Sequence, residues 1–172
     1  MSDLFHEDVP LDFICSVFDV MRRADQHQFQ VLTKRRARFR EMAPKLEWPG
    51  NVWMGVSVEY QRWTARIDDL RAVPASIRFL SCEPLLGPHQ LDLRGIEWVI
   101  VGGESGPGAR RMREEWAVSI QQRCEAAGVR FFFKQWSARD ADWVRRSKKS
   151  SGRLLLGRTW DGFPYERKGV RD

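Results

Sequence analysis

The chain repeats one pattern five times: a short apolar run, rich in β-branched or aromatic residues, ends abruptly in polar residues or glycines. Near-continuous apolar runs of this length are typical of strands that are buried on both faces of a parallel sheet. The sequence therefore predicts five strands, at residues 29–32, 52–56, 77–80, 98–101 and 131–133.

Helical patterns lie between several of these runs. Segment 114–127 places Trp116, Ile120 and Cys124 four residues apart on one face, and Gly128 after it is typical of a helix C-cap. The connection that precedes the fourth strand contains a Gly-Pro pair and too few residues for a long helix. Four helices are predicted, at residues 12–24, 36–46, 60–72 (with Trp63, Ile67 and Leu70 on one face) and 114–127.

Strands and helices that alternate at this spacing predict successive βα units and a parallel sheet, in the α/β class. Two architectures fit the pattern, an open doubly wound sheet and a (β/α)8 barrel, and the pattern does not choose between them. In both, ligands bind at the carboxyl ends of the strands. We expect residues 1–138 to form this domain and residues 139–172 to form a basic C-terminal extension that packs on it.

Polar side chains follow all five strands at the point where each strand ends. Because the carboxyl ends of parallel strands meet at one edge of a sheet, we expect one ligand-binding rim with three carboxylates and two lysines. Opposite charges at close range shift each other's pKa, so such a rim can hold a charged ligand or move protons. The alternative for any single residue is a cap or a salt bridge that closes the end of the sheet. The predicted rim residues are Lys34, Ser57, Glu59, Ser81, Glu83, Gly102, Gly103, Glu104, Ser105, Lys134 and Gln135.

The loop at 102–108 has four glycines in seven positions, which lets backbone amides approach a ligand closely. Arg110 and Arg111 follow this loop and are predicted anion contacts, whereas the alternative for the loop is a tight strand-to-helix turn. Cys82 suggests a nucleophile, but no histidine has an evident role as its base. We therefore expect a buried thiol at Cys82, and no catalytic residue is assigned.

Charge and cysteine spacing change this picture in two ways. The net charge is +6, from 29 Lys and Arg against 23 Asp and Glu, and much of the excess lies in residues 34–38 and 145–149. Such runs bind nucleic acid in some proteins and are solvated faces in most.

The cysteines Cys15, Cys82 and Cys124 are too far apart for a zinc ribbon or an iron–sulfur loop, so no metal site is expected. With neither a membrane span nor a secretory signal, we expect a cytoplasmic protein without a membrane partner.

Short motifs lie in a fixed order along the chain, at the strand ends and near the C-terminus. They are Leu32-Thr33-Lys34-Arg35, Gly55-Val56-Ser57-Val58-Glu59, Phe79-Leu80-Ser81-Cys82-Glu83-Pro84-Leu85-Leu86-Gly87, Val101-Gly102-Gly103-Glu104-Ser105-Gly106, Phe133-Lys134-Gln135-Trp136 and Gly157-Arg158-Thr159-Trp160. Over essentially the whole chain, this order resembles the phage-associated three-cysteine-motif proteins of phages, prophages and bacteria. That family is radical-SAM-like, which implies a (β/α)8 TIM-type barrel, a [4Fe–4S] cluster held by three N-terminal cysteines, and S-adenosylmethionine as cosubstrate.

By this resemblance, the chain supplies strands four to eight of the barrel, and Ser2-Asp3-Leu4-Phe5 resembles the loop that leaves strand three. The three-cysteine segment of the family has no counterpart here, so we expect the chain alone to hold no cluster and to be inactive in radical chemistry. Its rim would bind a small-molecule or macromolecular substrate, or the cosubstrate. A missing barrel half or a partner chain would cover the open edge of strand four. The alternatives are a cluster-free nucleic-acid-binding module and an inactive truncated remnant.

Overall fold

The structure, a computed structural model, describes residues 3–138 and 152–164. All five predicted strands are present, and so are the four predicted helices, of which those at 36–46 and 60–72 are shorter than expected. Among the described residues, no helix is both long enough and apolar enough to cross a membrane. The elements are α1 (Leu11–Arg23), β1 (Phe29–Thr33), α2 (Arg36–Met42), the 3-10 turn η1 (Ala43–Lys45), β2 (Val52–Ser57), the 3-10 turn η2 (Gln61–Trp63), α3 (Ala65–Arg71), β3 (Arg78–Cys82), β4 (Trp98–Gly102), α4 (Glu114–Ala127) and β5 (Arg130–Gln135).

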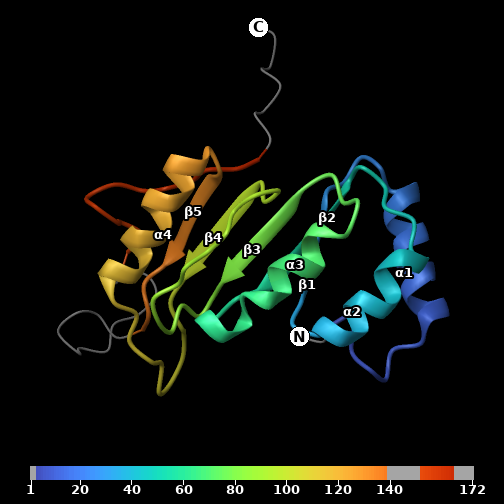
Figure 1. The fold of residues 1–172 in the computed structure, drawn as a ribbon, viewed down its shortest axis with the longest axis horizontal. Coiled ribbons are helices and arrows are strands. Elements are labelled where there is room, and N and C mark those ends of the chain that lie inside the picture. The colour runs from blue at the N-terminus through green and yellow to red at the C-terminus, as the bar shows by residue number, and fades with distance from the viewer. Residues whose placement is uncertain (1–2, 139–151, 165–172) are drawn as a thin grey trace, which may run out of the picture.

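The five strands form one parallel sheet in the order β1-β2-β3-β4-β5 (Figure 1). Each strand pairs with the next one along the chain, so that Phe29 lies opposite Val52 and Trp98 lies opposite Arg130. Crossovers between parallel strands are right-handed, and an unreversed order means that all of them wind in one direction. A doubly wound sheet reverses its order at a switch point, and the described strands contain no such reversal. The predicted parallel α/β sheet is confirmed.

The helices α3 and α4 cover one face of this sheet (Figure 1). Leu70 of α3 and Ile120 of α4 belong to the same buried core as Leu80 of β3 and Val99 and Val101 of β4. Alternate residues of the strands supply this core, because successive side chains of a strand point to opposite faces. Burial of this apolar surface is the main force that holds the helices on the sheet.

The other side of the strands carries a second, aromatic cluster. It consists of Trp53, Phe79 and Trp98 from β2, β3 and β4, all of which are buried. Phe163 covers the cluster, since its ring centroid lies 5.1 Å from those of both Trp53 and Trp98. The indole Nε1 of Trp98 donates a hydrogen bond to the carbonyl of Gly162 at 2.8 Å. Residues near the C-terminus therefore cover the face of the sheet that lies opposite the helices.

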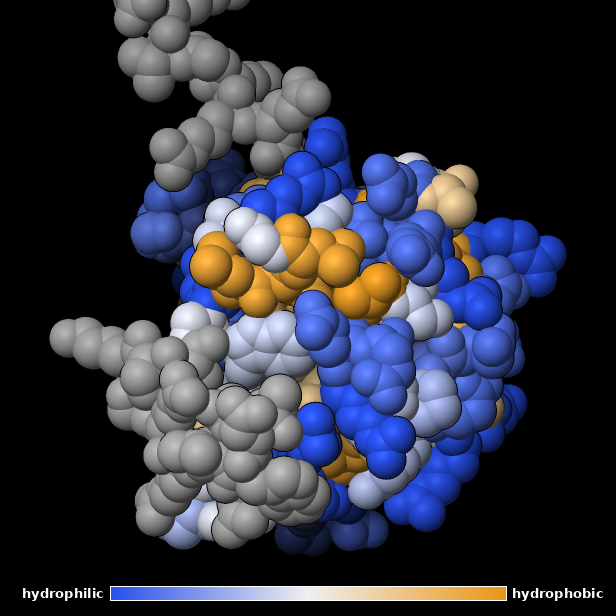
Figure 2. Space-filling model, turned by 90° about the vertical axis from the view of Figure 1, so that its left-hand side faces the viewer, coloured by the Kyte–Doolittle hydropathy of each residue, from blue (hydrophilic) through white to orange (hydrophobic). Residues whose placement is uncertain are grey.

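The same C-terminal segment also occupies the outer edge of β5. Phe133 N donates to the carbonyl of Trp160 at 2.9 Å, and Gly162 N donates to the carbonyl of Phe131 at 3.0 Å. These bonds form a short antiparallel pairing on the edge that β4 does not use. Figure 2 views the molecule from the side of α4 and β5 and shows a hydrophobic patch on that face. The domain division at residue 138 stays a prediction, and residues 139–151 lie outside the described part of the chain.

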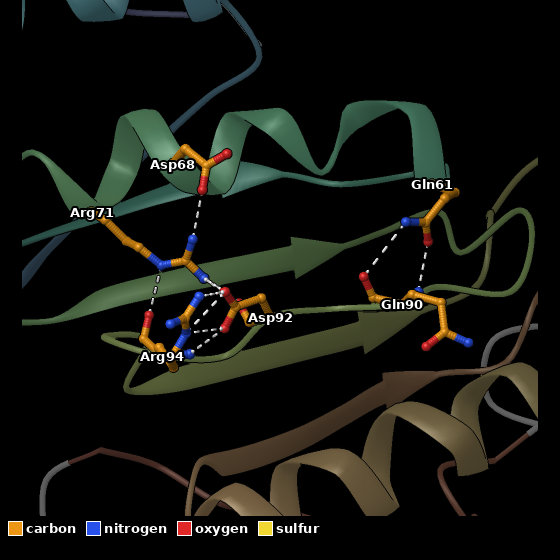
Figure 3. Close-up of polar contacts among 6 residues, drawn as sticks. All are labelled: Gln61, Asp68, Arg71, Gln90, Asp92 and Arg94. Atoms are coloured by element: carbon orange, nitrogen blue, oxygen red, sulfur yellow. Dashed lines mark hydrogen bonds and ion pairs between the residues drawn. The ribbon is translucent and has the colours of Figure 1, made fainter.

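The connection between β3 and β4 has no helix of its own, as the sequence predicts. Side chains from η2 and α3 hold it in place instead (Figure 3). Arg71 donates to the carbonyls of Asp92 and Arg94 at 2.6 and 2.7 Å, and the side-chain oxygen of Gln61 accepts from Gln90 N at 2.6 Å. These bonds give backbone groups of the connection partners that no helix or strand supplies. These hydrogen bonds hold the connection against α3 and thereby position the residues that lead into β4.

Candidate ligand-binding rim

The predicted rim residues all lie at or directly after the carboxyl ends of the strands. These ends are Thr33, Ser57, Cys82, Gly102 and Gln135, and they share one edge of the sheet because all five strands run in the same direction. The charged members gather into three groups, each centred on one of the predicted carboxylates. The rim is therefore a row of matched charges along the end of the sheet.

Glu59, two residues beyond β2, is the centre of the first group. Lys34 Nζ lies 2.5 Å from its Oε1, and Arg66 Nη1 donates to its Oε2 at 2.9 Å. The same Arg66 nitrogen donates to the carbonyl of Ser57 at 2.6 Å. The Glu59 side chain is only 11% exposed. Burial acts to raise its pKa, but the hydrogen bond from Lys34 and the charges of Lys34 and Arg66 lower the pKa below its usual range. Glu59 is thus a fixed anion at neutral pH.

Glu83 and Lys134 form the second group, which joins β3 to β5 across β4. Lys134 Nζ lies 2.8 Å from Glu83 Oε2. The Glu83 side chain passes over Gly102, where an added Cβ would lie 3.3 Å from its Cδ. The side chains of Glu83 and Lys134 are 22% and 49% exposed, so solvent reaches both charges. This pair therefore offers a ligand one accessible charge of each sign.

Glu104 and Arg110 form the third group in the loop after β4. Arg110 donates to the Glu104 carboxylate through Nε at 2.9 Å, through Nη2 at 2.8 Å and through its backbone N at 2.8 Å. These bonds lower the pKa of Glu104 to about 2. Arg110 also donates to the hydroxyl of Tyr60 at 3.2 Å. Arg111 is partly buried. The prediction that Arg110 and Arg111 contact an anion remains open, since the partner of Arg110 here is a carboxylate of the chain itself.

Most of the uncharged rim residues have packing roles in this structure. Gly103 N donates to the carbonyl of Gln135 at 2.9 Å, and the Gln135 side-chain amide donates to the carbonyl of Gly103 at 3.2 Å. An added Cβ on Gly103 would lie 2.6 Å from Ser137 Cα, which leaves room only for glycine. Ser57 and Ser81 pair in the register of β2 and β3 and are buried, whereas Ser105 is exposed in the following loop.

The cysteines do not fit the cluster that the family resemblance implies. Cys15 is exposed on α1, whereas Cys82 in β3 and Cys124 in α4 are buried. Burial raises the pKa of the Cys82 thiol above its usual range and that of Cys124 to about 12. A raised pKa disfavours the thiolate, which is the form of cysteine that binds iron or zinc. Within residues 3–138 and 152–164, no three His, Cys, Asp or Glu side chains are grouped to hold a metal ion.

Two clefts of the structure lie away from the rim. One of about 840 Å³ is lined by Ile77, Glu97 and Arg130, which lie at or before the amino ends of β3, β4 and β5. Another of about 460 Å³ lies between α2 and α3, where Arg36 and Asp69 line it. None of the predicted rim residues lines either cleft.

The basic run at residues 34–38 is matched by carboxylates rather than left as a free charged surface. Each of its four cations has an acidic partner within 4.0 Å. The run at 145–149 lies outside the described residues. Binding of nucleic acid through these two runs therefore stays a prediction. The ion pairs are Lys34–Glu59, Arg35–Glu7, Arg36–Asp69 and Arg38–Glu41.

Two features near the rim were missed by the sequence analysis. Arg66 completes the Glu59 group, but one arginine seven positions after a glutamate is not a distinctive signal. Trp63 was expected on the buried face of a helix with Ile67 and Leu70; those two are buried, whereas Trp63 lies in η2, outside α3, and is 37% exposed. A tryptophan at that position is consequently available to a ligand.

The fold and the rim define a class of protein: a parallel α/β domain whose strand ends carry matched pairs of opposite charge. Within that class, residues 1–164 match the model of a family described as a protein of unknown function (DUF5131), so the chain belongs to this family. No curated protein and no solved structure gave a match. Membership of the phage-associated three-cysteine-motif group stays a prediction.

Proposed function

We propose that the carboxyl ends of β1 to β5 form the substrate- or cosubstrate-binding rim of a radical-SAM-like, phage-type protein with a partial (β/α)8 barrel. The observation that carries the proposal is the Glu83–Lys134 pair, which places two accessible, opposite charges across β4. The unreversed strand order supports the barrel, because barrel strands are wound in one direction. The motif order of the sequence supports the family.

The barrel that we propose is open at β5. In a closed barrel the last strand pairs with the first, so that no edge remains. Here the edge of β5 is already hydrogen-bonded to Trp160 and Gly162, and a further strand would have to displace them. Among the described strands, β1 pairs with β2 alone. A missing barrel half or a partner chain would therefore extend the sheet at β1.

The ligand that suits the rim is zwitterionic. Glu83 accepts hydrogen bonds from an ammonium group, and Lys134 donates to a carboxylate, so a ligand with both groups replaces the internal pair without leaving either charge unmatched. The amino-acid part of S-adenosylmethionine has this character. Because Cys15, Cys82 and Cys124 do not fit a cluster, the role of this chain is to bind the ligand.

Calorimetric titration of the chain with S-adenosylmethionine tests this proposal. We expect binding, weakened about tenfold or more (about 1.4 kcal/mol) by Lys134→Gln and by Glu83→Gln. The matched control is Arg94→Gln, which removes the cation of another exposed pair, with Asp92 at 2.6 Å, near the opposite ends of the strands. Equal weakening by the control would overturn the proposal. So would the absence of binding at millimolar ligand, which is the result that an inactive remnant predicts.

A further inference from the structure

Two aromatic rings beside the rim are surrounded by arginines. The guanidinium carbon of Arg62 lies 4.8 Å from the ring centroid of Tyr60 and 5.0 Å from that of Trp63. The guanidinium carbon of Arg66 lies 4.5 Å from the Trp63 ring. These four residues, Tyr60, Arg62, Trp63 and Arg66, are the aromatic–arginine cluster. The first three lie just after Glu59 in the connection from β2 to α3, and Arg66 lies in the first turn of α3.

The cluster and its surroundings have a surplus of positive charge. Glu59 is the carboxylate partner of both Arg66 and Lys34. Arg62 contacts the two rings and has no carboxylate within 4.0 Å in the part of the chain that the structure describes. Three cations therefore face a single carboxylate, and the unpaired one is the exposed Arg62. An anion that binds Arg62 does not have to break an existing ion pair.

The two arginines have different roles in holding Trp63. Arg66 is nearly buried and fixed by Glu59 and by the carbonyl of Ser57, so it holds one side of the tryptophan in a constant position. In the part of the chain that the structure describes, Arg62 is held only by its contacts with the rings, and such exposed cation–π contacts are weak. A planar ligand can therefore exchange places with Arg62 at low cost. The tryptophan is 37% exposed, which leaves ring surface for stacking.

We propose that the aromatic–arginine cluster binds a nucleoside phosphate, either a free nucleotide or one unit of a single-stranded nucleic acid. The base stacks on Trp63, and the phosphate binds the guanidinium group of Arg62. Nucleic-acid-binding proteins stack bases on exposed aromatic side chains, and guanidinium groups bind phosphate through two parallel hydrogen bonds. The inference goes beyond the charged rim, because it uses neither Glu83 nor Lys134.

Calorimetric titrations with adenosine 5′-monophosphate, adenosine, inorganic phosphate and a short single-stranded oligonucleotide test the proposal. We expect the nucleotide to bind more tightly than adenosine or phosphate alone. Trp63→Ala and Arg62→Gln should each weaken nucleotide binding about tenfold or more, whereas Trp63→Phe should retain most of it. The matched control is Arg158→Gln, which removes an exposed arginine stacked 3.6 Å from the Trp160 ring centroid and should leave binding unchanged.

The outcomes separate the two ligand sources and the two proposals. Tighter binding of the oligonucleotide than of the nucleotide, with a steep dependence on salt, supports nucleic acid as the source. Equal or weaker binding of the oligonucleotide supports a free nucleotide. Binding of neither ligand overturns the inference, as does an equal loss in Arg158→Gln or full affinity in Trp63→Ala. Glu83 and Lys134 stay intact in these variants, so failure here is distinguishable from failure to bind S-adenosylmethionine.

Discussion

Glu83 at the end of β3 and Lys134 at the end of β5 form an ion pair across the intervening strand β4, with 2.8 Å between Lys134 Nζ and Glu83 Oε2. Gly102 in β4 gives the glutamate room to lie flat across the strand end. Both side chains reach solvent, which screens their attraction, and exposed ion pairs typically contribute only about 0–1 kcal/mol to stability. The pair therefore positions two charges at the rim without being a main support of the fold.

This relationship predicts that either charge can be removed at little cost to folding. Glu83→Gln and Lys134→Gln should each lower the free energy of unfolding by less than about 1 kcal/mol, because water replaces the lost partner. Urea unfolding of both single variants and of the double variant measures the individual and coupling energies. A loss above about 2 kcal/mol in either single variant would identify the pair as a structural support instead of a ligand site.

Gly103 should be much less tolerant of substitution. In Gly103→Ala, the new Cβ would overlap the backbone of Ser137, so the end of β4 or the chain after β5 must move. We expect a loss of about 2 kcal/mol or more, as overpacking against backbone usually causes. Gly87→Ala is the control, since nothing lies within 4 Å of its added Cβ and its loss should stay within about 0.5 kcal/mol. Similar stability of the two variants in urea would refute this account of the rim.

Phe163 should stabilise the sheet from the face opposite the helices. Phe163→Ala removes a ring that packs against both Trp53 and Trp98. The ring is 40% exposed, so we expect a loss of about 1–2 kcal/mol, below the 3–5 kcal/mol of a fully buried phenylalanine. The near-ultraviolet circular dichroism of the tryptophans should change as well. Leu154→Ala, at a position more than half exposed, is the control; an equal loss there would mean that Phe163 does not cover the cluster.

The strands and the positions of the rim were predictable because parallel strands buried on both faces leave a continuous apolar pattern. All six residues of β2, Val52–Ser57, are buried. The partners within the rim were not predictable in this way. Glu83 and Lys134 are 51 positions apart, and their contact depends on the order of strands in the sheet, which apolar periodicity does not specify. The sequence thus predicted which residues lie at the ends of the strands but not which of them pair.

Trp63 shows a second limit of periodicity. The apolar spacing of the segment fits a continuous helix, but Trp63 N bonds to the carbonyl of Tyr60 and Thr64 N to that of Gln61, three residues back. Such a turn has three residues per turn instead of 3.6, which rotates Trp63 away from the buried face of α3. The backbone pairing of residues 160–162 with the edge of β5 was not predictable for a different reason, since this segment has no strand-like apolar run.

His89 should make the stability of the protein depend on pH near neutrality. It is 2% exposed, and its Nδ1 lies 2.8 Å from the carbonyl of Gly87. Burial lowers the pKa of His89, although the hydrogen bond to Gly87 opposes this in part. In the unfolded chain a histidine titrates near pH 6.5. The unfolded chain therefore takes up the proton first as the pH falls, so the stability contributed by neutral His89 is present above about pH 6.5 and is lost below it.

The expected loss per pH unit is at most about 1.4 kcal/mol, the value for a difference of one bound proton. Urea unfolding at pH 7.5, 6.5 and 5.5 measures it. His89→Gln should flatten the dependence because the titrating group is gone, whereas His27→Gln, at an exposed histidine, should leave the wild-type slope. If His89→Gln retained the full slope, the dependence would have to come from other groups. The buried imidazole beside the rim would then play no part in the pH response of the fold.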